Sequence, residues 1–136
     1  MVKVQLKRCF AVKLGIPLVL LMTAACQTTK PQISEDQYLN PAQMSEFMNN
    51  KKYTGFSQPN GISFQAFIKN DGTIEGESGS SVDSGTWRLD DNVVCMNWDK
   101  WRYAEEYCIR VIERPDGRFQ TYYLDGSKSS VFSLNE

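Results

Sequence analysis

The sequence predicts a mainly β domain, in which a small antiparallel meander of seven or eight strands closes into a barrel or half-barrel behind one N-terminal α-helix. From residue 62 onward, apolar and polar side chains alternate with a period of two, as in strands with one buried face. Turn sequences such as Asn70-Asp71-Gly72 and Pro115-Asp116-Gly117 separate these segments at short intervals. Because closure removes unpaired edge strands, this meander favours a barrel.

The helix is predicted to begin after Asn40, a good N-cap, with Pro41 at the first helical position. Lys51 and Lys52 suit the C-terminal end of the helix dipole, and Gly55 is expected to prevent continuation. The apolar stripe of the helix, which we expect to pack in the core, consists of Met44, Phe47 and Met48.

The strands are predicted at residues 62–68, 73–77, 85–89, 93–98, 105–113, 118–124 and 131–134, with a flexible loop at 78–81. If 93–98 and 105–111 form a hairpin, Cys95 lies opposite Cys108. A bridge there closes a loop of about 14 residues and contributes roughly 3 kcal/mol to stability. Without histidine, two cysteines make a poor metal site, and their spacing is not that of a Cys-x-x-Cys redox pair, so a structural disulfide is predicted.

Residues 1–25 are predicted to be a secretory signal peptide, because a cationic segment precedes an apolar run at 14–22 that is far shorter than the ~20 residues of a membrane span. Ala24-Ala25-Cys26 resembles the lipobox of bacterial lipoproteins, although Thr23 stands where that family usually has Leu. The resemblance implies acylation of Cys26. Ordinary cleavage near Ala25, which would give a soluble periplasmic protein, is the alternative.

The expected organisation is therefore a signal at 1–25, a lipidated N-terminus and tether at 26–37, and a β-barrel-like domain at 38–136. In enterobacterial lipoproteins, an Asp after the acylated cysteine retains the protein in the inner membrane. The presence of Gln27 there implies an outer-membrane anchor, with the domain facing the periplasm or the exterior.

Charge and composition exclude several function classes. Four of the 15 cations and none of the 16 acids precede Cys26, so the remainder carries a net charge of −5 and is a poor partner for nucleic acid. The absence of histidine removes the commonest general base and transition-metal ligand. No catalytic or metal-binding constellation and no cofactor are predicted, and we expect a protein that is not an enzyme.

The segment from Leu39 to the C-terminus resembles an uncharacterised family of small exported alphaproteobacterial proteins, through Ser84-Gly85-Thr86-Trp87-Arg88, Cys95-Met96-Asn97-Trp98, Cys108 and Phe132. This resemblance implies a fold and an exported location and supplies no activity. Gly85-Thr86-Trp87 also resembles the Gly-x-Trp of lipocalins, which belongs on a barrel's first strand and here lies mid-domain.

Two stretches carry candidate binding residues. Ser84-Gly85-Thr86-Trp87 is similar to the Ser-Gly-x-Tyr loop of periplasmic lysozyme inhibitors, with Trp87 in place of the usual Tyr; alternatively, Trp87 is a core residue. The presumed disulfide loop gathers aromatic and charged residues typical of binding hot spots. Trp98 is expected to be buried and Trp101 presented; alternatively, Trp101 folds back over the barrel mouth. The candidate binding residues are Trp101, Arg102, Tyr103, Ser84 and Trp87.

The function expected from the sequence is that of a non-enzymatic envelope lipoprotein whose β-domain binds a protein or a cell-envelope glycan. Inhibition of a basic lysozyme-like lytic enzyme is the alternative, favoured by the net charge and the Ser84–Trp87 resemblance. The third hypothesis is a hydrolase of unknown type.

Overall fold

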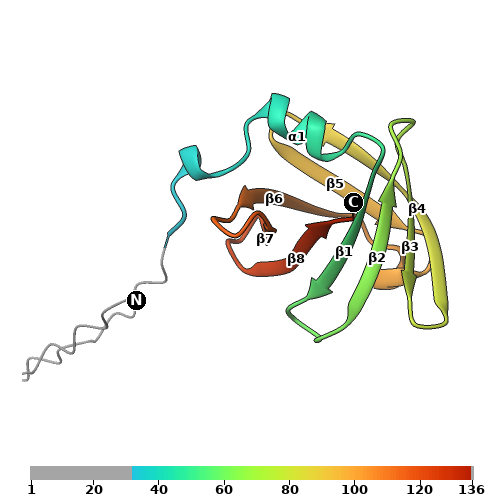
Figure 1. Ribbon diagram of the computed structural model, residues 1–136. Coiled ribbons are helices and arrows are strands. Elements are labelled where there is room, and N and C mark those ends of the chain that lie inside the picture. The colour runs from blue at the N-terminus through green and yellow to red at the C-terminus, as the bar shows by residue number, and fades with distance from the viewer. Residues whose placement is uncertain (1–31, 136) are drawn as a thin grey trace, which may run out of the picture.

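The computed structural model describes residues 32–135, and in them eight antiparallel strands follow one another around a closed barrel (Figure 1). Strand β8 pairs with β1 to complete the ring. The prediction of a mainly β barrel with one α-helix ahead of it is thereby confirmed. The predicted signal peptide and Cys26 lie outside the described residues. None of the helices within 32–135 is long and apolar enough to cross a membrane.

The helical elements are η1 (Glu35–Gln37), α1 (Pro41–Phe47) and η2 (Trp101–Ala104). The strands are β1 (Lys51–Ser57), β2 (Ser63–Ile68), β3 (Thr73–Ser78), β4 (Ser81–Asp90), β5 (Val93–Trp98), β6 (Tyr107–Glu113), β7 (Phe119–Tyr123) and β8 (Lys128–Leu134). Because consecutive strands run in opposite directions, the β1–β2, β3–β4, β5–β6 and β7–β8 connections share one end of the barrel. The α1 segment, which leads into β1, lies at the other end (Figure 1).

The N-terminus of α1 has the predicted capping arrangement. Asn40 Oδ1 accepts the Gln43 amide at 3.0 Å, and Gln43 Oε1 accepts the Asn40 amide at 2.9 Å, which completes a capping box. The stripe of Met44, Phe47 and Met48 is buried, as expected. The cap fixes where the helix starts, and the stripe fixes which face covers the barrel.

The predicted C-terminal end of the helix was wrong. Lys51 and Lys52 belong to β1, since the chain leaves the helix after Phe47 and turns through Asn50, whose φ is 50°. Tyr53 points inward from β1 and is only 1% exposed, so the alternation of a strand extends across this segment. Gly55 does not end an element: it lies inside β1, where the Phe64 ring occupies the space that a Cβ would need.

The segment predicted as a flexible loop at 78–81 is a tight turn instead. Strand β3 extends to Ser78 and β4 begins at Ser81, so the turn centres on Gly79 and Ser80, with φ of 59° at Gly79. A left-handed glycine allows the two strands to pair up to their ends. Consequently β4 runs from Ser81 to Asp90, longer than the predicted 85–89.

The predicted disulfide is confirmed. Cys95 on β5 lies opposite Cys108 on β6, and the two sulfurs are bonded. Glu106 lies close to the bridge, but neither sulfur is a free thiolate that could ligate a metal with it. The bond therefore fixes the register of β5 and β6 at the base of their long connection.

The end of the barrel beneath α1 is filled by aromatic rings. Phe47 packs against Tyr53 and Phe119, with ring centroids 4.8 and 4.9 Å apart, and meets Phe132 edge-on at 6.3 Å. The Tyr53 hydroxyl donates to the Phe47 carbonyl at 2.8 Å, and burial, reinforced by Glu46, raises the pKa of this phenol far above its ordinary value. These contacts close one end of the barrel with tightly packed side chains.

Candidate functional site

A cavity of about 490 Å³ lies inside the barrel. The small inward-facing Ala66 on β2 helps to make the space. Its neighbour in the sheet register, Gly76 on β3, makes room for the Trp98 and Trp101 rings instead. Protein interiors normally contain few voids larger than a water molecule. An eight-stranded barrel is wide enough either to be filled by its side chains or to hold one small ligand, and this barrel retains the space for a ligand.

The cavity is apolar at its floor and along its walls. Phe47 and Met48, next to the α1 end, line it at one extreme. The apolar wall residues are Phe64, Ala66, Ile68, Ile74, Val94, Met96, Ile109 and Phe132. Such a lining favours ligands that bury hydrocarbon or aromatic surface.

Polar residues gather at the opposite, open end. They come from the strand ends and the connections at that end, and those that line the cavity are Ser57, Asn60, Ser78, Ser81, Arg102, Ser129 and Ser130. The cavity therefore runs from an apolar floor to a polar mouth. A molecule with one apolar and one polar end would match this gradient.

Two tryptophans form one side of the mouth. Trp98 is buried at 4% exposure, as predicted, and its ring lies 4.9 Å from that of Trp101. The Trp101 ring packs over Gly76, where a side chain would collide with it, and its indole N–H donates to Ser81 Oγ at 3.0 Å. The structure thus has Trp101 folded back over the barrel mouth, half-buried, and not presented outward.

Asp83 was missed in the sequence and holds this arrangement in place. Its Oδ2 accepts the backbone amides of Lys100 and Trp101 at 3.0 and 2.7 Å, while the residue is only 4% exposed. Within residues 32–135, its Oδ1 has no hydrogen-bond partner. Burial raises the pKa of this carboxyl, but three amide donors, among them Trp101 and Lys100, lower it more, so the pKa lies below its ordinary value.

The signal that could have identified Asp83 is its place in the strand alternation. Gly85 and Trp87 face inward from β4, so Asp83, two residues before Gly85, must face inward too. A charged residue on the buried face of a strand is costly unless it is hydrogen-bonded. The sequence alone could not place Asp83 near the mouth, because that position depends on its contacts with Lys100 and Trp101 in the β5–β6 connection.

The turn after Trp101 has an unusual backbone. Arg102, Tyr103 and Ala104 have successive φ values of 55°, 59° and 56°, a left-handed conformation that non-glycine residues rarely adopt. Such strain is often found at functional sites. The turn separates its side chains, because Arg102 lines the cavity whereas Tyr103 does not and is 94% exposed.

The Arg102 side chain is fixed by two tyrosines. Its guanidinium lies 3.9 Å from the centroid of the Tyr107 ring and 5.3 Å from that of Tyr123, and its Nη1 donates to the Tyr123 hydroxyl at 2.9 Å. Tyr107 in turn accepts the indole N–H of Trp98 at 3.1 Å. Burial raises the pKa of Tyr107 despite that hydrogen bond and the nearby Arg102, so its hydroxyl is neutral at physiological pH.

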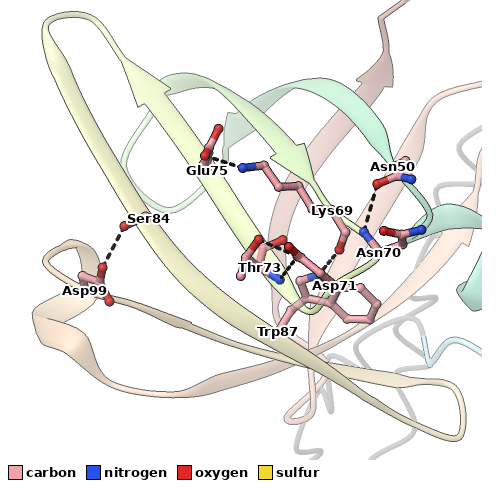
Figure 2. A network of polar contacts seen from close by, with 9 residues as sticks. All are labelled: Asn50, Lys69, Asn70, Asp71, Thr73, Glu75, Ser84, Trp87 and Asp99. Atoms are coloured by element: carbon pink, nitrogen blue, oxygen red, sulfur yellow. Dashed lines mark hydrogen bonds and ion pairs between the residues drawn. The ribbon is translucent and has the colours of Figure 1, made fainter.

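Ser84 and Trp87 do not form one surface, as Figure 2 shows. Three positions apart on β4, they face opposite sides of the sheet. Ser84 Oγ donates to Asp99 at 2.8 Å on the outside of the barrel, next to the mouth turn. The Trp87 indole donates to the Lys69 and Thr73 carbonyls at 2.9 and 3.1 Å, beside the β2–β3 turn at the α1 end.

The structure therefore brings Trp101 and Arg102 together at one mouth, places Ser84 and Tyr103 on the outside, and places Trp87 at the other end of the barrel. The cavity is thus an apolar chamber whose entrance is lined by the Arg102 guanidinium and by the indoles of Trp98 and Trp101. Comparisons with protein-family models, with curated proteins and with solved structures find no match to this chain.

Proposed function

We propose that this domain is a non-enzymatic binding protein that holds one small, mainly apolar ligand inside its barrel. The observation that carries the proposal is the cavity of about 490 Å³ running from an apolar floor to a polar mouth. Small-molecule sites typically have about 300–1,000 Å³, apolar walls and a few polar groups that fix orientation. This cavity has all three properties.

The energetic basis of the proposed binding is burial of apolar ligand surface. Each Å² removed from water is worth about 25 cal/mol, so even a small hydrocarbon gains several kcal/mol on entry. The walls belong to a closed sheet with a fixed register and are pre-formed. A pre-organised site loses little conformational entropy when it binds, so more of this gain appears as affinity.

The expected export and lipid anchor remain part of the proposal. The Cys95–Cys108 bridge supports an oxidising compartment, where such bonds form and persist. Anchoring through Cys26 to the outer membrane would place the barrel where apolar and amphipathic envelope molecules are present. The support for the anchor is the lipobox resemblance in the sequence.

Binding of an envelope protein or glycan on the outer surface is a second candidate. The observation that favours it is the exposure of Tyr103, whose side chain is 94% exposed. Tyr103 lies in the loop that the Cys95–Cys108 disulfide closes. The net negative charge of the domain still supports inhibition of a basic lytic enzyme. This hypothesis gains no support from Ser84 and Trp87, because they face opposite sides of β4 and are hydrogen-bonded there.

Filling the cavity tests the primary proposal. We expect the purified protein to bind Nile red, a neutral polarity-sensitive dye, with a saturable rise in fluorescence. Ala66→Phe places a ring in the cavity and should weaken that binding at least about tenfold, or about 1.4 kcal/mol. Gln65→Phe adds the same ring to the exposed face of the same strand and should leave the affinity unchanged.

Thermal melts verify that both variants are folded, since overpacking can itself cost about 1–3 kcal/mol. A folded Ala66→Phe protein that binds the dye as tightly as the unmodified protein would show that the cavity is not the binding site.

A further inference from the structure

We infer that the ligand is an amphiphile with an anionic head, which Arg102 holds at the barrel mouth while the apolar tail extends toward α1. This inference rests on the proposed function and specifies its ligand class. It begins from the charges of the cavity. Among the described residues that line it, Arg102 is the one charged side chain, and no carboxylate is among them.

Arg102 retains the capacity to bind an anion. A guanidinium has five N–H donors, and the Tyr123 hydroxyl accepts from Nη1 alone. No ion pair joins Arg102 to a carboxylate anywhere in residues 32–135. The remaining donors fit the paired oxygens of a carboxylate or a phosphate, which arginine binds in a bidentate manner.

The position of this charge is fixed before any ligand arrives. The guanidinium lies over the Tyr107 ring and beside that of Tyr123, and the left-handed turn that carries it belongs to the loop closed by the Cys95–Cys108 bridge. An arginine free in solvent would lose rotamer entropy on binding, whereas this side chain has already lost much of it. The turn thus presents a pre-organised cation at the entrance to an apolar chamber.

A wholly apolar ligand fits this site less well. It would cover a guanidinium and take it out of water without supplying a hydrogen-bond acceptor, which is costly for a charged group. An anionic head avoids that cost, and the serines and Asn60 at the mouth provide further hydrogen-bond donors for it. The tail then occupies the walls and the floor formed by Phe47 and Met48.

The test compares two ligands that share one tail. Decanoate and decanol are titrated into the full-length protein by displacement of Nile red. We expect decanoate to bind at least about tenfold more tightly than decanol. Arg102→Gln should remove that preference by weakening decanoate about tenfold while leaving decanol unchanged.

Arg118→Gln is the matched control. Arg118 is exposed in the β6–β7 connection at the α1 end, so its loss changes the net charge equally without altering the mouth. It should leave both affinities unchanged. Equal weakening of decanoate by the two substitutions would mean that general electrostatics, and not Arg102, set the preference, and would overturn the inference.

The remaining outcomes separate this inference from the proposal on which it rests. If both ligands bind with equal affinity, the cavity binds apolar tails and the anionic head is refuted. If neither ligand nor Nile red binds, the proposed function itself fails. Decyl phosphate in the same assay distinguishes the head groups, since tighter binding than decanoate assigns the site to phosphorylated amphiphiles, and weaker binding assigns it to carboxylates.

Discussion

The two ends of the barrel are built differently. At the α1 end, Phe47, Tyr53, Phe119 and Phe132 fill the space with ring contacts and Met44 is fully buried. At the other end, a strained turn, a half-buried indole and an exposed arginine surround the entrance to a cavity. The comparison indicates that one end supplies stability, whereas the other leaves an opening into the cavity, which the proposed ligand binding requires.

The difference follows from what the chain places at each end. A helix ahead of β1 brings an apolar face to one opening, and covering that opening buries large side chains at once. Within residues 32–135, no α-helix covers the mouth in this way. There, the disulfide and the Asp83 hydrogen bonds keep the turn ordered, and neither needs a packed core to do so.

The largest effect should come from removing the central ring of the α1 end. Phe47→Ala deletes a ring that is 5% exposed and contacts three others, so we expect a loss of about 3–5 kcal/mol in the free energy of unfolding. Tyr103→Ala, an aromatic truncation at the exposed mouth turn, should change it by less than about 0.5 kcal/mol. Urea denaturation measures both. Equal losses would show that the two ends contribute alike and would contradict the comparison.

The next effect concerns the disulfide at the base of the mouth turn. The cysteines are 13 positions apart, and replacing both by serine should lower the unfolding free energy by about 3 kcal/mol, because the unfolded chain loses a covalent constraint. Reductant should destabilise the unmodified protein similarly and leave the double variant unaffected. A double variant as stable as the unmodified protein would show that the turn is held by its other contacts.

The fold was predictable because its signals are local. Alternation, Asn- and Gly-rich turns and the Asn40 cap each specify a neighbouring piece of backbone, and the register that joins Cys95 to Cys108 follows from one hairpin. Strand β1 was missed where local signals conflicted. Two lysines and Gly55 suit a helix end, whereas the inward contacts of Tyr53 that favour a strand are tertiary.

The site could be predicted only in part. Trp101 and Arg102 stand out by residue type, but the direction of each side chain depends on three left-handed residues with no glycine to signal them. The cavity itself results from the sizes of inward residues on several strands, Ala66 among them, and from no single segment. Its volume becomes apparent only when the barrel is closed.

Of the three stabilising contacts, the smallest effect should come from Asp83, whose carboxylate joins the mouth turn to β4. Asp83→Asn removes the charge but keeps an acceptor, so we expect a loss of about 1.5 kcal/mol at neutral pH, at the low end for hydrogen bonds to charged groups. Because the folded pKa of Asp83 lies below its ordinary value, its contribution is complete above the unfolded pKa of about 3.9. It decreases as the pH falls through the folded pKa, where protonation abolishes the charge. The difference in stability between the two proteins should therefore be constant near neutrality and shrink below about pH 4.

Red-shifted tryptophan emission should accompany release of the turn, and the shift should be absent in a Trp101→Phe background, since Trp101 is the indole that the turn carries. A stability difference that persists unchanged into acid would mean that the Asp83 side chain acts through its shape alone, and that its charge does not hold Trp101 over the cavity.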